Sequence, residues 1–289
     1  MNNPATSSLR GIAFMLAAVV AFSLMDVSLK LLSPHYPAMQ VAALRGLTSL
    51  PLVLVWIATT GGFRQILTRR WHLHLLRGLL AVAMLSAFAF ALRDLPLAEA
   101  YSLFFVAPLL VTALAVPLLG ERVGWKRWIA ILVGLAGVLV VLRPTASRMF
   151  NLGSVAVLVA AVAYAFSAIT VRVLGRTEST QSMVFWVIIL LSVFATAAAW
   201  NEWVAVHVEH WPILLVLAIS GALGQYAITE AFKHSDASVI APFDYTALIW
   251  GVTFDALIWH TVPDRWMLIG AGIIIGSGLY LIRREQSPA

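Results

Sequence analysis

Residues Ala91–Leu142 read ALRDLPLAEAYSLFFVAPLLVTALAVPLLGERVGWKRWIAILVGLAGVLVVL. Residues Ala231–Ile282, roughly 140 positions later, follow the same order of features. In each stretch an apolar segment ends at a short polar corner, a proline-containing apolar segment follows, and a glycine-spaced apolar segment completes the unit. Self-similarity at so long a spacing in a very apolar chain predicts two repeats of one structural unit.

The composition predicts an integral membrane protein. Of the 289 residues, 61% are hydrophobic and only 11% are charged, whereas soluble domains carry about 25% charged residues. The net charge of +6 would suit a nucleic-acid partner, but the basic residues stand at the ends of apolar segments, as topology signals do. We therefore expect a lipid bilayer as partner and no nucleic acid. The chain has no cysteine, which excludes disulfides and thiolate metal sites.

Ten segments are apolar enough to cross a bilayer, which takes about 20 residues per helix. Because a spanning segment must satisfy its own backbone hydrogen bonds, and because no alternating strand pattern is present, these segments are predicted to be helices. The sequence thus predicts an all-α polytopic membrane protein with ten transmembrane helices. The segments are 11–32, 37–59, 72–92, 97–119, 127–142, 152–174, 180–200, 211–232, 237–259 and 265–282.

The ten segments divide into two halves of five, residues 1–147 and 148–289. With the N-terminus in the cytoplasm, thirteen Lys and Arg residues fall on the cytoplasmic side and five on the other side. This bias favours cytoplasmic N- and C-termini. After five crossings the second half begins on the opposite side, so the two repeats are predicted to have inverted topology. The first segments of the halves also match weakly, AFSLMDVSLKLL against AFSAITVRVLGR.

Several short pieces of the repeated stretch carry a family resemblance. They are Leu95-Pro96, Ala98-Glu99-Ala100, Pro108, Gly120-Glu121-Arg122 and Gly134 with Gly137. Together they resemble the end of an EamA domain of the drug/metabolite transporter superfamily, and residues 237–285 resemble a second such domain. The resemblance covers essentially the whole chain. One departure is that Trp259-His260 stands where the first repeat has Gly120-Glu121, so a helix corner that depends on the Glu would differ between the halves.

The resemblance implies two inverted five-helix repeats around a central cavity, with helices 1–4 and 6–9 enclosing the path. Within the family, the length and spacing resemble YddG-type amino-acid exporters of bacterial inner membranes. The expected function is export of small metabolites, amino acids first and hydrophobic or aromatic ones included, by alternating access. The alternative is an uptake carrier for a vitamin- or nucleoside-like metabolite, because family members similar to riboflavin or S-adenosylmethionine carriers share the Ala-Pro-Phe-Asp-Tyr-Thr run at 241–246.

Ionisable residues inside a membrane are costly and are therefore candidates for function. Arg45 lies about eight residues into the second segment, roughly 12 Å deep. Its guanidinium could bind a substrate carboxylate, or it could cap backbone carbonyls. Asp244 follows Pro242 in the ninth segment and could bind an ammonium group, carry a proton, or join two helices. Glu230 is the second candidate for a proton or charge site, although it lies near the inner end of its segment and could simply be hydrated.

Uncharged side chains complete the candidate substrate site. Gln225 lies deep in the eighth segment and offers both donors and acceptors. A cavity lined mainly by aromatic rings would suit neutral amphiphiles or hydrophobic amino acids better than phosphorylated sugars. The same rings could instead fill space between helices. The aromatic candidates are Phe88, Tyr101, Tyr164, Trp186, Tyr245 and Trp250.

Other features bear on motion and on the class of protein. Pro108 should bend the fourth segment, and with Pro242 it is a candidate hinge, the alternative being static kinks. Asp26 and Asp255 are expected nearer the membrane interface. The seven His residues stand almost entirely in loops and at segment ends, so we expect no enzyme, cofactor or metal site. Ten helices in one chain are compatible with a monomer.

Overall fold

The computed structural model describes residues 4–121, 123–142 and 152–260, and isolated positions between 265 and 280. All regular elements in this part of the chain are helices, which confirms the predicted all-α class. The elements are α1 (Pro4–Leu32), α2 (Ala38–Thr60), η1 (Phe63–Ile66), α3 (Trp71–Ala91), α4 (Leu97–Phe104), α5 (Ala107–Leu119), α6 (Trp125–Leu142), α8 (Leu152–Leu174), α9 (Thr180–Ala199), η2 (Trp200–Glu202), η3 (Val208–His210), α10 (Trp211–His234), α11 (Ala237–Ile240), η4 (Ala241–Thr246) and α12 (Ala247–Ile258).

Eight stretches of the described chain are helical, long and apolar enough to cross a membrane. They coincide with eight of the ten predicted segments; α4 with α5 makes one stretch, Leu97–Leu119, and α11, η4 and α12 make another, Ala237–Ile258. The fifth predicted segment is α6, which contains a shorter apolar helix, Trp128–Gly137. Of the tenth, 265–282, the structure describes isolated positions only. The outer faces carry many exposed Leu, Ile and Val side chains, as lipid contact requires.

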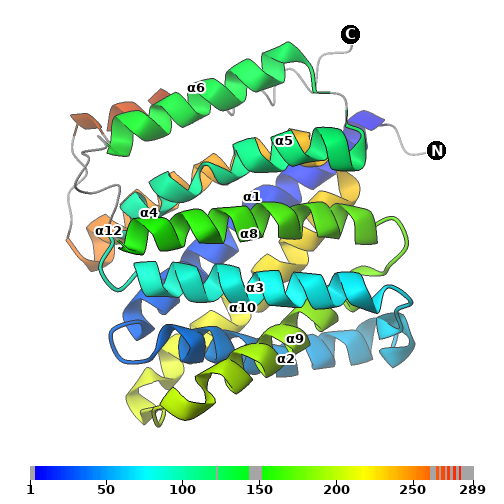
Figure 1. The fold of residues 1–289 in the computed structure, drawn as a ribbon, viewed down its shortest axis with the longest axis vertical. Coiled ribbons are helices and arrows are strands. Elements are labelled where there is room, and N and C mark those ends of the chain that lie inside the picture. Colours follow the sequence, from blue (N-terminus) through cyan, green and yellow to red (C-terminus); the bar gives the residue numbers. More distant parts are fainter. Residues whose placement is uncertain are drawn as a thin grey trace.

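Helices from the two halves of the chain lie side by side (Figure 1). α1 packs along α10, α2 along α9 and α3 along α8, while α4 contacts α12. α1 and α10 run antiparallel, because Gly11 lies against Ser235 near the end of α10 and Phe22 lies against Gly224 in its middle. A Cβ atom on Gly224 would stand 2.6 Å from Phe22 Cδ1, so the small residue allows this close packing.

The two proline-containing segments are both interrupted. α4 ends at Phe104 and α5 begins at Ala107, one residue before Pro108. In the second half the 3-10 helix η4, with Pro242 near its start, separates α11 from α12. Proline lacks an N–H and its ring disfavours helical geometry in the preceding residue, which explains both interruptions. Both interruptions lie at the predicted hinges, Pro108 and Pro242. Motion about these two positions stays a prediction.

α6 lies along one edge of the bundle, beside α4 and α5 (Figure 1). Its inner face approaches Tyr245 of η4 closely, since a Cβ atom on Gly134 would stand 2.6 Å from Tyr245 Cε2. This position leaves α1–α5 and α8–α12 to surround the centre of the molecule, where buried polar residues such as Asp26, Arg45 and Asp244 lie.

Candidate substrate cavity

A cavity of about 120 Å³ lies among helices from both halves of the chain. Its volume is below the roughly 300–1,000 Å³ of sites for drug-sized ligands, so this conformation has room for a small molecule or for part of a larger one. Most of its lining is apolar or aromatic. The polar lining residues are Ser23, Asp26, Arg45, Tyr101, Tyr164, Gln225 and Asp244.

Two buried carboxylates face this cavity, and each accepts a hydrogen bond from a tyrosine. The Tyr101 hydroxyl of α4 donates to Asp26 Oδ2 of α1 at 2.8 Å. The Tyr164 hydroxyl of α8 donates to Asp244 Oδ2 of η4 at 2.7 Å. Asp26 and Asp244 are only 7% and 9% exposed. Because an ionised carboxylate can accept more than one hydrogen bond, both retain capacity for an ammonium group, and either could take up a proton.

Arg45 of α2 supplies a positive charge to the same cavity. Its Nη2 donates to Gln225 Oε1 at 3.2 Å and lies 3.4 Å from the Gly221 carbonyl oxygen. Its Nε has no hydrogen-bond partner although the residue is only 4% exposed. Among the described residues no carboxylate forms an ion pair with it. A buried guanidinium with an unused N–H suits a ligand carboxylate.

Aromatic rings connect the two carboxylate–tyrosine pairs. Phe88 stacks on Tyr101 with centroids 6.1 Å apart, and Phe104 contacts both Phe88 at 5.8 Å and Tyr164 at 5.3 Å. The predicted site residues Arg45, Phe88, Tyr101, Tyr164, Gln225 and Asp244 are therefore brought together around one cavity.

Three predicted aromatic residues lie elsewhere. The Trp186 indole N–H donates to the Ile66 carbonyl at 2.9 Å, so this ring packs near the start of α3. Trp250 stacks on Phe254 one turn along α12, at 6.1 Å. Tyr245 points toward α6 and Phe105. All three were chosen for their depth in the membrane, and depth does not determine which face of a helix a side chain occupies.

Glu230 also lies outside the cavity. It accepts a short hydrogen bond from Thr180 of α9, and its Oε2 is 3.4 Å from His234 Nδ1. Lys233 donates to the same threonine at 3.2 Å. This polar cluster sits at the end of α10, as the sequence position indicated. A role for Glu230 in proton coupling stays a prediction.

Two charged residues are buried where the sequence predicts contact with water. Asp26 is expected nearer the interface, but it is buried and lines the cavity. Asp255 lies near the end of its span, as expected, and is buried there against the neighbouring helices. The spacing of Ser23 and Asp26, one helical turn apart, could have indicated a shared polar face. Arg77 is one of the thirteen basic residues that the sequence assigns to the cytoplasmic side, yet it is buried among the helices and its Nη1 donates to the Met183 carbonyl at 2.8 Å.

Comparison with known proteins identifies the family. The model of the EamA-like transporter family matches residues 9–143 and again residues 151–284. The chain belongs to the EamA-like transporter family. Its relatives are transporters of the drug/metabolite superfamily, so this EamA-like protein is a multi-pass membrane transporter in a family of bacterial transporters.

Three relatives of this EamA-like transporter are named for three different transported compounds. The S-adenosylmethionine uptake transporter of Rickettsia bellii is 31% identical over 99% of this chain and 98% of its own length. The riboflavin transporter of Vibrio cholerae is 30% identical over 97% of this chain and 95% of its own length. The pseudopaline exporter CntI of Pseudomonas aeruginosa is 26% identical over 96% of this chain and 97% of its own length. A protein of known crystal structure has the same fold, with a TM-score of 0.79 at 18% identity, over 99% of this chain and 100% of that one.

Proposed function

We propose that this transporter exports amino acids and compounds with an amino-acid end across the bacterial inner membrane. The observation that carries the proposal is the charge pattern of the cavity. One guanidinium, Arg45, and two carboxylates, Asp26 and Asp244, stand in a lining that is otherwise mostly apolar or aromatic. A zwitterionic amino acid has a carboxylate for Arg45 and an ammonium group for an aspartate. Its side chain would contact rings such as Phe88 and Phe104.

Alternating access by two inverted repeats, residues 1–147 and 148–289, is the proposed mechanism. The separate family matches to each half and the antiparallel packing of α1 on α10 support this arrangement. The pairing of α1 with α10 and of α3 with α8 supports it too, because in a two-fold arrangement the first helix of each repeat meets the third helix of the other. Ten helices and cytoplasmic termini remain part of the proposal, with Pro108 and Pro242 as hinges.

Coupling to protons is assigned first to Asp244 and second to Glu230. Asp244 lines the cavity and has a tyrosine as its hydrogen-bond partner, so a substrate ammonium group and a proton would compete for it. Glu230 lies in the cluster at the end of α10, from which it could take up protons from one face.

The direct test is flux of radiolabelled Met, Phe and Thr into proteoliposomes that contain the purified protein. Saturable flux is expected, and Arg45→Gln should reduce it roughly tenfold or more, because a charged hydrogen bond to the substrate is lost. Arg10→Gln is the matched control, since it removes a positive charge from an exposed position on α1. Absence of flux for every amino acid, under proton gradients of either sign, would overturn the proposal.

Uptake of a vitamin- or nucleoside-like metabolite is the second candidate. The names of the S-adenosylmethionine and riboflavin carriers, at 31% and 30% identity, favour it. S-adenosylmethionine itself has an amino-acid end, which the Arg45 region would bind in the same way. Riboflavin lacks that end. Inhibition of methionine flux by S-adenosylmethionine alone would support an amino-acid site, whereas flux of riboflavin without any amino-acid flux would support the second candidate.

A further inference from the structure

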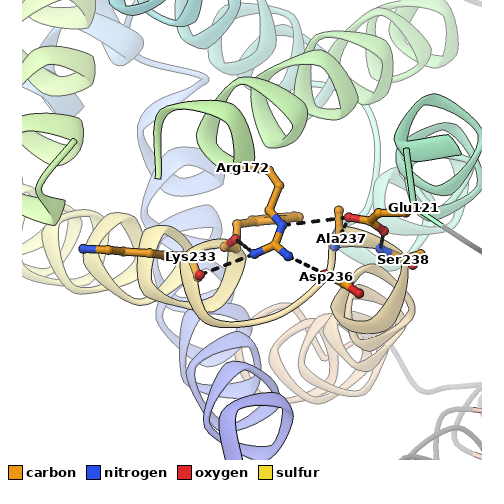
Figure 2. Close-up of polar contacts among 7 residues, drawn as sticks. Glu121, Arg172, Lys233, Asp236, Ala237 and Ser238 are labelled. Carbon is orange, nitrogen blue, oxygen red and sulfur yellow. Dashed lines mark hydrogen bonds and ion pairs between the residues drawn. The ribbon is translucent and has the colours of Figure 1, made fainter. Parts of the chain in front are cut away.

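Glu121 connects the end of the fourth span of the first half to the start of the fourth span of the second half (Figure 2). This residue follows α5, and its two carboxylate oxygens accept hydrogen bonds from the backbone N–H groups of Ala237 at 2.9 Å and Ser238 at 3.0 Å. Arg172 of α8 lies beside it, with Nε 3.9 Å from Glu121 Oε1, and pairs closely with Asp236. The carboxylate thus satisfies N–H groups that the start of a helix leaves unpaired.

Asp255 makes the reverse connection. It lies near the end of α12, and its Oδ2 accepts a hydrogen bond from the backbone N–H of Ala98 in the first turn of α4 at 3.0 Å. Its Oδ1 pairs with Lys30 of α1 at 2.9 Å, and the Lys30 ammonium group stands 4.0 Å from the centroid of the Trp259 ring. Here too, a carboxylate at the end of one span caps the start of the other half's span, with a basic residue beside it.

The two caps correspond in the repeats although their carboxylates do not correspond in sequence. Ala98 and Ser238 are separated by the same interval as the repeated stretches that begin at Ala91 and Ala231. The second repeat has Trp259-His260 where the first has Gly120-Glu121, and Asp255 supplies the missing carboxylate about one and a half turns earlier.

The caps lie at opposite ends of the path. The span Leu97–Leu119 has 23 residues, about 35 Å as a helix. Asp255 binds at its start and Glu121 follows its end. Tyr101 and Phe104 of this span line the cavity, as do Asp244 and Ala247 of the antiparallel span. One cap therefore lies at each end of the two spans whose middle residues line the cavity.

We propose that Glu121 and Asp255 are positioning residues of the transport cycle, each of which holds one end of the path closed. The spans they join are the two interrupted helices beside the cavity, and they belong to different halves of the chain. If the halves separate at one face to admit solvent, the cap at that face must break while the other persists. Opening of one face then breaks one set of charged hydrogen bonds, and water hydrates the groups that are released. Opening of both faces together would break both sets, so the two caps disfavour it.

The test uses a cysteine inside the cavity, which is feasible because the chain has no native cysteine. Ser23→Cys places a thiol on the cavity lining. A membrane-impermeant maleimide is added to right-side-out or inside-out vesicles, and exposed loop reporters, Arg176→Cys and Glu202→Cys, identify the faces. Glu121→Ala should raise labelling of the cavity thiol roughly tenfold from the Arg176 face only. Asp255→Ala should raise labelling from the opposite face only.

Matched controls separate the caps from other charges at the same ends. Glu178→Gln changes a carboxylate near the Glu121 end that accepts hydrogen bonds from Thr68 and Ser182, and it should not change labelling. Arg172→Gln removes the ion pairs with Glu121 and Asp236 and the hydrogen bonds to the Phe232 and Lys233 carbonyl oxygens. It leaves both backbone N–H groups bound to Glu121, so its effect should be smaller than that of Glu121→Ala.

If an alanine variant fails to fold, Glu121→Gln and Asp255→Asn keep one acceptor oxygen each and should give the same face-specific pattern at lower amplitude. Equal labelling changes at both faces, or no change in variants that remain folded, would overturn the proposal. Labelling needs no substrate, so this outcome is independent of which metabolite is transported.

Discussion

The Tyr164 hydroxyl donates a hydrogen bond to Asp244 Oδ2 at 2.7 Å, and this bond joins α8 to η4 at the cavity. Tyr101 and Asp26 form the corresponding bond between α4 and α1. The two pairs exchange roles, since the aspartate comes from the first span in one half and the tyrosine comes from the first span in the other. Two carboxylates of the same cavity are therefore each held by a phenol from a neighbouring span.

Removal of either phenol should destabilise the protein. Tyr164→Phe and Tyr101→Phe leave a buried carboxylate without its partner, which costs about 1–3 kcal/mol. We expect a lower melting temperature in detergent for both variants. Tyr245→Phe is the matched control, because the Tyr245 hydroxyl has only a long contact, 3.5 Å, to the Ile131 carbonyl. Equal losses in all three variants would mean that the aspartates do not depend on these bonds.

Asp244→Asn should remove the response of transport to an imposed proton gradient. The amide cannot take up and release a proton, but its oxygen can still accept a hydrogen bond from Tyr164. We expect exchange of substrate between the two sides to persist while flux driven by a proton gradient falls to the exchange level. Flux into proteoliposomes measured with and without imposed proton gradients of either sign checks this, with Glu230→Gln tested in parallel. If both variants keep the native response to the gradient, neither carboxylate couples transport to protons.

Phe88 and Trp186 should respond differently to substitution. Phe88 lines the cavity, so Phe88→Leu should raise the KM for hydrophobic amino acids several-fold by removing ring contacts with the substrate. Trp186→Phe removes the hydrogen bond to Ile66 and should lower stability by about 1 kcal/mol with little change in KM. Initial-rate kinetics and thermal unfolding on the same preparations separate the two effects. A raised KM in Trp186→Phe alone would place that ring on the substrate path.

Hydropathy predicted the spans well and the site only in part. The expected segments 72–92 and 97–119 agree with the helical stretches Trp71–Ala91 and Leu97–Leu119 to within one residue. Hydropathy locates the spans, and the position of a residue within its span indicates depth; Arg45 and Asp244, predicted in this way, both line the cavity. It carries little information on rotation about the helix axis, because helices apolar on all sides have no polar face to orient them. Trp250 and Tyr245 lie in the predicted ninth span but do not line the cavity.

The caps could not have been predicted from the pattern alone. The sequence indicates that Glu121 could stabilise a helix corner. The N–H groups that it binds, however, belong to Ala237 and Ser238, which stand 116 and 117 positions later in the chain. Asp255 occupies no position that matches Glu121. Only the packing of the two halves brings each carboxylate to the start of the other half's span.

Gly134 and Gly124 give a test of packing at the edge of the bundle. A Cβ atom on Gly134 would lie 2.6 Å from Tyr245 Cε2, whereas one on Gly124 meets nothing within 4 Å. Gly134→Ala should therefore destabilise the protein by about 1–3 kcal/mol through overpacking, and Gly124→Ala should not. Melting temperatures compare the two. A stable Gly134→Ala variant would show that α6 can move outward at no cost.

Substitution by lysine should affect the two buried arginines, Arg45 and Arg77, differently. Arg77 binds protein groups, the Met183 carbonyl at 2.8 Å and Thr229 Oγ1 at 3.4 Å, and does not line the cavity. Lysine cannot reproduce the spread donors of a guanidinium, so Arg77→Lys should lower the melting temperature and leave KM near the native value. Arg45→Lys should raise KM for amino acids about tenfold with a smaller loss of stability, because the group facing the substrate changes. Amines that lack the carboxylate, such as decarboxylated substrates, should not distinguish Arg45→Lys from the native transporter. If they do, Arg45 acts on the shape of the cavity and not on the substrate carboxylate.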